Sequence, residues 1–164
     1  MIDAARHLIE AVTPLRQDCG ALCGRACCAS NPDDPSGMIL FPGEERLYDP
    51  APDWAQTESI EFEGLRCVLL RCIKPCPRDM RPLACRIFPL TPIMRGCKAS
   101  LRMDRRAFSI CPLAEHGIAA LDRAFVSAVK EATRLLATDH SCRMYLAALA
   151  DRQERISNWS SIVL

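Results

Sequence analysis

Residues 19–28 read CGALCGRACC and place four cysteines within ten positions. The C-x3-C-x3-CC spacing sets Cys19, Cys23 and Cys27 four residues apart, so a locally helical backbone presents these thiols on one face. The adjacent Cys28 points another way in any regular element. The segment therefore predicts several thiols aimed at one centre, with the adjacent pair either serving two centres or contributing one packing residue.

The whole chain is rich in sulfur, with 11 cysteines in 164 residues. The cysteines that follow the opening group, up to the change of character after residue 112, are Cys67, Cys72, Cys76, Cys85, Cys97 and Cys111. The odd total disfavours a disulfide framework, and Asp3 and Arg6 interrupt the apolar stretch that a signal peptide needs. No apolar run reaches the roughly 20 residues that cross a bilayer. We therefore expect a cytoplasmic protein without membrane contact, whose thiols bind metal or carry out redox chemistry.

The ligand chemistry limits the choice of metal. Thiolates are soft donors that select zinc, copper(I) or iron–sulfur clusters over magnesium and calcium. His7, His116 and His140 lie outside the cysteine runs, so we do not expect histidine ligands. No two successive cysteines show the C-x2-C gap that zinc knuckles prefer, whereas iron–sulfur ligation accepts varied spacings. This favours a [4Fe–4S] cluster, with zinc as the alternative.

The net charge of the chain is +1, but residues 61–111 carry eleven basic and four acidic side chains. A centre with four thiolates carries about −2 overall, and nearby guanidinium groups lower the cost of burying that charge. We therefore take Arg81 and Arg86 as candidate cofactor-binding residues, while a solvated basic face remains the alternative for the outer arginines. Nucleic acid is not an expected partner, because the region lacks interleaved aromatic residues.

Five stretches together resemble the YkgJ-type cysteine cluster family, whose CxxCxCC domain is assigned to zinc or iron chelation. They are CGALCGRACC, GMILFPGEE at 37–45, Cys67-Val68-Leu69-Leu70, CPRDMRPLACRIFPL at 76–90, and Cys111-Pro112, and they include the family's double cysteine and its R-P-x-x-C-R motif. The resemblance spans residues 18–112. It implies a small domain that gathers about eight cysteines around metal, and some larger relatives act in protein lysine methylation through an iron–sulfur cluster.

Matched position by position, the resemblance assigns metal ligands to Cys19, Cys23, Cys27, Cys28, Cys67, Cys76, Cys85 and Cys111. Cys72 and Cys97 have no firm counterpart and stay candidate ligands, while Cys142 is expected to pack in a helix. The opening is spaced more widely than the family's CxxCxCC, which leaves open how its four sulfurs share centres. Pro77 and Arg78 stand where the family often has an aromatic residue.

Three functions remain open from the sequence. The first is a metal-binding protein with a redox, metal-handling or accessory role, and with an unidentified protein or redox partner. The second is a cluster-dependent enzyme acting in redox or methyl-transfer chemistry, although no catalytic residue can be assigned. The third is a zinc-stabilised interaction module. The last two helices also offer a surface for a homodimer.

The expected fold is mainly α with short β-hairpins and forms a single domain over residues 1–164. An irregular cysteine-rich core over 18–112 is flanked by an N-terminal helix over 2–12 and by a pair of C-terminal helices within 113–164. Apolar periodicity predicts one of these helices from Ile118 to Leu136 and the other from a cap at Ser141. Hairpins are expected over 60–70 and 91–103, a short helix over 83–87, and a turn over 31–37, NPDDPSG.

Overall fold

The computed structural model describes residues 1–28 and 37–162, with side chains up to Ser157. The predicted turn at 31–37 lies outside the described residues except for Gly37. The helices are α1 (Ile2–Leu8), α2 (Gly20–Cys23), α3 (Leu83–Ile87), α4 (Arg123–Leu136) and α5 (His140–Ile162). Short 3-10 turns are η1 (Ala26–Cys28), η2 (Glu45–Tyr48), η3 (Arg105–Ser109), η4 (Pro112–Ala114) and η5 (Ile118–Ala120).

The strands of the described residues form two antiparallel sheets. One has the order β1-β3-β2, from β1 (Met38–Ile39), β3 (Leu65–Cys72) and β2 (Ala55–Phe62). The other pairs β4 (Leu90–Arg95) with β5 (Lys98–Met103). The chain is 44% helical and 20% strand. The prediction of a mainly α fold is therefore wrong, and the fold is a small mixed α/β arrangement.

The β2/β3 hairpin accounts for much of this difference. The apolar alternation predicts pairing only over 60–70, but Ala55 already pairs with Cys72, and the register continues to Phe62 opposite Leu65. The first half of β2 is mostly polar and exposed, so it carries no alternating pattern. Its strand conformation comes from hydrogen bonding to the more apolar β3 and not from its own side chains.

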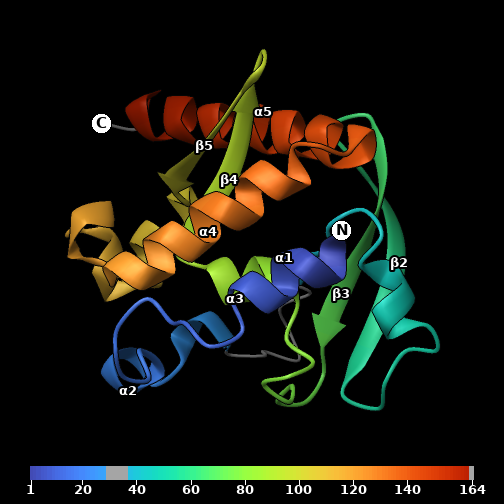
Figure 1. The fold of residues 1–164 in the computed structure, drawn as a ribbon, viewed down its shortest axis with the longest axis horizontal. Coiled ribbons are helices and arrows are strands. Elements are labelled where there is room, and N and C mark those ends of the chain that lie inside the picture. The colour runs from blue at the N-terminus through green and yellow to red at the C-terminus, as the bar shows by residue number, and fades with distance from the viewer. Residues whose placement is uncertain (29–36, 163–164) are drawn as a thin grey trace.

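The large core lies between the N-terminal helix, the two long helices and the β4/β5 hairpin. α1 packs against α4, and α5 packs across β4 (Figure 1). Ile2, Ala5, Phe125, Val129 and Leu146 are nearly or fully buried in this core. α1 ends four residues earlier than predicted, because Ile9 and Glu10 donate to the carbonyls of Arg6 and His7 in a tightened last turn.

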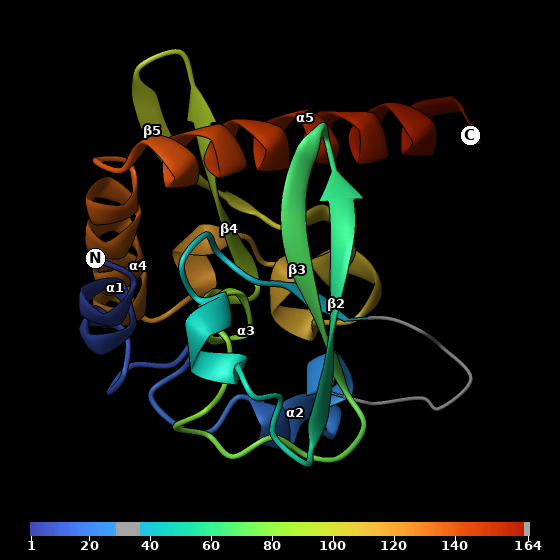
Figure 2. The ribbon, with the colours of Figure 1, turned by 90° about the vertical axis from the view of Figure 1, so that its right-hand side faces the viewer.

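A smaller apolar cluster lies under the β1-β3-β2 sheet. Leu40, Tyr48, Trp54, Ala55 and Leu70 form it, and the rings of Tyr48 and Trp54 meet edge to face at 6.0 Å. In the view of Figure 2, α5 crosses one end of the molecule, whereas α2 and the loop after β3 lie at the opposite end. This second end carries most of the cysteines.

Candidate metal centre

All eleven cysteines fall in the described part of the chain, and each is a free thiol. The opening cysteines lie on α2 and η1 and immediately before α2. Cys72 closes β3, Cys76 lies in the following loop, Cys85 is on α3, and Cys111 immediately precedes η4. The fold thus brings thiols from distant parts of the sequence to the end of the molecule opposite α5 (Figure 2).

One group of thiols surrounds the guanidinium of Arg81. We call Cys28, Cys72, Cys76 and Cys85 the Arg81 thiols. The side chain of Arg81 hydrogen-bonds to Cys76 and interacts electrostatically with Cys28 and Cys85. Cys72 hydrogen-bonds to Cys76 and interacts with Cys28 and Cys85. These neighbours outweigh the effect of burial and raise the pKa of Arg81 above its usual value, so this cation stays charged beside the thiols.

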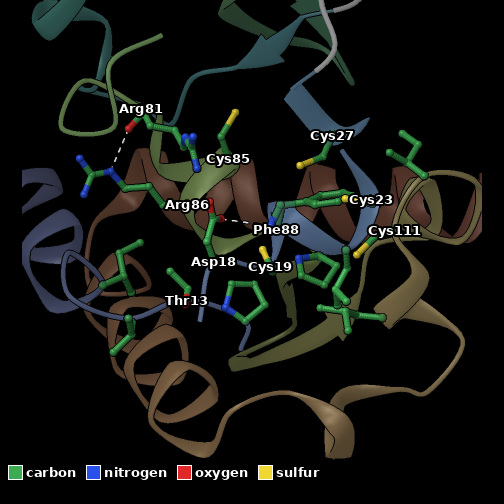
Figure 3. Close-up of a pocket in the computed structure, with 18 of the residues that line it drawn as sticks. Thr13, Asp18, Cys19, Cys23, Cys27, Arg81, Cys85, Arg86, Phe88 and Cys111 are labelled. Atoms are coloured by element: carbon green, nitrogen blue, oxygen red, sulfur yellow. Dashed lines mark hydrogen bonds between the residues drawn. The ribbon is translucent and has the colours of Figure 1, made fainter. Parts of the chain in front are cut away.

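A second group of thiols lies around an open cavity with a volume of about 70 Å³. We call Cys19, Cys23, Cys27 and Cys111 the pocket thiols; Figure 3 shows them with the other residues that line the cavity. Cys19 interacts electrostatically with Cys111 and Cys23. Much of the remaining wall is apolar and includes Ile9, Val12, Leu22, Phe88 and Ile110. Cys85 reaches the same cavity from the side of Arg81.

Two hydrogen-bonded thiol pairs differ in their protonation. The Sγ atoms of Cys27 and Cys28 lie 3.9 Å apart. The hydrogen bond from Cys27 is the largest cause that lowers the pKa of Cys28 to about 6, and the pKa of Cys27 rises in turn. In the same way, Cys72 lowers the pKa of Cys76 to about 6, with a further contribution from Arg81. Each pair therefore offers one thiolate near neutral pH, and thiolate is the form that binds metal.

The loop that carries Arg81 is anchored by the buried ion pair between Arg6 and Glu44. The Glu44 carboxylate is completely buried and accepts hydrogen bonds from Arg6 Nη1 at 2.7 Å, from the Leu83 amide at 2.7 Å and from the Phe41 amide at 3.2 Å. Arg6 also donates to the carbonyl of Arg81 at 3.0 Å. Burial raises the pKa of Glu44. These contacts fix the start of α3 and the backbone of Arg81.

The sequence pattern gives no indication of the pair formed by Glu44 and Arg6. The two residues are 38 positions apart, and no spacing rule connects them. The contact between this buried acid and a basic residue near the N-terminus can be identified only in the folded structure. Tyr48 completes the support, because its hydroxyl donates to the Met80 carbonyl at 2.7 Å.

Arg86, the second predicted cofactor-binding residue, contacts backbone atoms of the same loop. Its guanidinium donates to the carbonyl of Arg81 at 2.9 Å, of Asp79 at 2.6 Å and of Arg78 at 3.4 Å. The first of these bonds is drawn in Figure 3. Arg86 therefore shapes the loop, whereas Arg81 is the arginine that interacts with the thiols.

The structure places Cys67, Cys97 and Cys142 outside both groups. Cys67 is buried in the large core on β3, five residues before Cys72. Five residues of strand span about 16 Å, and the odd separation turns the two side chains to opposite faces of the sheet. Cys97 is exposed at the turn between β4 and β5, and Cys142 is buried on α5. Cys72, a candidate in the sequence, takes the place among the thiols that was predicted for Cys67.

The donor set fits a soft metal or a cluster. Arg81 Nε is buried and has no hydrogen-bond partner among the described residues, and such a donor beside three thiols suits an anionic sulfur acceptor. Within the described residues, no three His, Cys, Asp or Glu side chains stand in the arrangement of a metal site.

No helix in the described part of the chain combines the length and the apolar character needed to cross a membrane. Comparisons with family models, with curated proteins and with solved structures find no match to this chain.

Proposed function

We propose that this chain is a metal-binding module of the YkgJ type that holds iron–sulfur through its cysteine thiolates, with zinc as the alternative metal. One observation carries the proposal: thiols from η1, the end of β3, the following loop and α3 lie together around Arg81. Of the eight ligands taken from the family resemblance, all except Cys67 belong to one of the two thiol groups. Cys72 is the eighth cysteine of these groups.

A half-buried arginine supports an anionic centre at this place. A tetrathiolate zinc or a four-iron cluster carries about −2, and its burial is costly without a compensating cation. Arg81 supplies one positive charge next to the thiols and keeps a donor unpaired. The hydrogen bonds of Arg6, Glu44 and Arg86 hold the loop in place, so the guanidinium is positioned before a metal binds.

An iron–sulfur cluster at this place would supply one-electron redox chemistry. The residues of the chain bind it through sulfur, orient Arg81 toward it and screen it from water on one side with the apolar cluster of Leu40, Tyr48 and Trp54. A redox or metal-handling role is the function that this arrangement supports best.

The test is metal and acid-labile sulfide analysis of the full chain, purified without oxygen, together with a visible absorption spectrum. We expect iron and sulfide in equal amounts and a broad absorption at about 400 nm. The control is Cys97→Ser, which changes an exposed thiol far from both groups and should keep the full metal content. Bound zinc without sulfide would reject the iron–sulfur assignment. A chain that holds neither metal, also after reconstitution with ferrous iron and sulfide or with zinc, would reject the function.

A further inference from the structure

The eight clustered thiols divide by their neighbours. Cys28, Cys72, Cys76 and Cys85 interact with one another and, except for Cys72, with Arg81 directly. Cys19 interacts with Cys111, Cys23 and also Arg81, and Cys27 interacts with Cys23 and Cys19. The two groups meet at the pair Cys27–Cys28, whose members are adjacent in the chain, and at Arg81 and Cys85, which also line the cavity of the pocket thiols. Each group holds four sulfurs, the number that closes one tetrahedral zinc site or one cubane cluster.

The two groups also rest on different parts of the fold. Cys72 and Cys76 pack against the small cluster of Leu40, Tyr48 and Trp54. Cys19 and Cys111 pack against the large core. Two members of each group therefore pack against different apolar clusters of the fold.

The adjacent cysteines turn to different sides because of their local backbone. Cys27 and Cys28 belong to the 3-10 turn η1, in which successive side chains are about 120° apart. Cys27 lines the cavity together with Cys19, Cys23 and Cys111 (Figure 3), whereas Cys28 interacts with Arg81 and Cys76. A double cysteine in such a turn is suited to supply one ligand to each of two centres.

We propose that the chain holds two separate four-thiolate centres, one formed by Cys28, Cys72, Cys76 and Cys85 and the other by Cys19, Cys23, Cys27 and Cys111. This inference rests on the proposed metal-binding function and adds the number of centres and the membership of each. It places Cys72 among the ligands and leaves Cys67 as a core residue. The second centre borders the open cavity, so it is the more accessible of the two.

Three matched double variants of the full chain test this partition by metal and sulfide content per folded chain. Cys72→Ala with Cys76→Ala removes two ligands of one centre, and Cys19→Ala with Cys23→Ala removes two of the other. Cys67→Ala with Cys97→Ala is the control. We expect the first two to keep half of the wild-type metal each and the control to keep all of it. Gel filtration isolates the folded fraction and circular dichroism verifies its secondary structure. The metal contents can then be compared even if one variant is partly misfolded.

The adjacent pair gives a second, sharper measurement. Cys27→Ala should make only the cavity-side centre labile to a chelator, and Cys28→Ala only the centre beside Arg81, so each single variant loses half of its metal rapidly. The inference is overturned if a double variant loses all metal, if Cys27→Ala and Cys28→Ala affect the same half, or if the wild type holds a single centre. A wild type without any metal instead rejects the proposed function, so the two failures are distinct.

Discussion

At the scale of single residues, a buried ion pair contributes more to the stability of the fold than an exposed one does. α1 and the segment around η2 are joined by two ion pairs of different character. Arg6 and Glu44 are paired with side chains 12% and 0% exposed, whereas Arg46 and Asp3 are paired with side chains 54% and 65% exposed. An exposed pair contributes less than about 1 kcal/mol, because water and salt screen it.

Glu44→Ala should lower the free energy of unfolding by about 3 kcal/mol, because it leaves the Arg6 guanidinium and the Leu83 amide without their acceptor. Asp3→Ala breaks the exposed pair between the same parts of the chain and is the matched control, with an expected loss below about 1 kcal/mol. Urea denaturation of both variants measures the difference. Equal losses would mean that Glu44 does not anchor the loop of Arg81.

At the scale of elements, capping groups explain where the long helices begin. α4 starts at Arg123 and not at Ile118, because Asp122 accepts hydrogen bonds from the amides of Ala124 and Phe125, while 118–120 form a separate 3-10 turn. α5 includes Ser141, which was the predicted cap, and the amide of Cys142 donates to Asp139. The apolar periodicity identifies both helices, but the caps set their first residues.

The end of β5 is tied to α5 by the buried carboxylate of Asp104. It accepts from Arg106 Nη2 at 2.7 Å and from Gln153 Nε2 at 3.1 Å, and Gln153 accepts from the Arg105 amide at 2.8 Å. Burial alone would raise the pKa of Asp104, but the bonds from Arg106 and Gln153 outweigh it and lower the pKa below its usual value. The β4/β5 hairpin and α5 are therefore joined by the Asp104 carboxylate, whose hydrogen bonds favour its ionised form.

Asp104→Asn should cost about 2 kcal/mol of unfolding free energy at neutral pH, the scale of hydrogen bonds to a charged group. Because the pKa of the folded state is lowered, this stabilisation is present above the unfolded value of about 3.9 and is lost as pH falls through the folded value. The difference in unfolding free energy between the wild type and the variant should therefore become smaller below about pH 4. Thermal unfolding across this range checks it, with Asp53→Asn at an exposed site as the control. A difference that stays constant with pH would contradict the prediction.

At the scale of the whole molecule, the two ends differ in what holds them together. The α5 end consists of a packed core with α4 and the β4/β5 hairpin. Between Ala21 and Cys28 the opening segment is exposed apart from the half-buried Cys23. If the proposed metal is bound, metal–sulfur bonds are expected to contribute more to the order of this end than apolar packing does.

Removal of the metal with a chelator should loosen residues 18–28 and the loop over 73–82, while α4 and α5 keep their helical structure. Limited proteolysis with mass spectrometry should then find new cleavage sites in these two segments, and helical circular dichroism should change little. The Cys67→Ala with Cys97→Ala variant, treated in the same way, should behave like the wild type. Cooperative loss of all structure on chelation would contradict the separate behaviour of the two ends.

The amino-acid sequence by itself determined the local features of this protein. The hairpin over 91–103, the short helix over 83–87 and the apolar face of α4 depend on residues close together in the chain, and the structure confirms these elements. The concentration of cysteines and the surplus of positive charge near them could also be identified from the sequence. These features follow from local propensity and periodicity.

Only the tertiary structure decided how the thiols are grouped and what supports them. The family resemblance assigns Cys67 as a ligand and leaves Cys72 only a candidate, but their positions on β3 send Cys67 into the core and Cys72 toward Cys76. The strand content and the Glu44–Arg6 pair likewise depend on partners far away in the sequence. Such contacts arise from the packing of distant segments, and burial then selects which charges and thiols face one another.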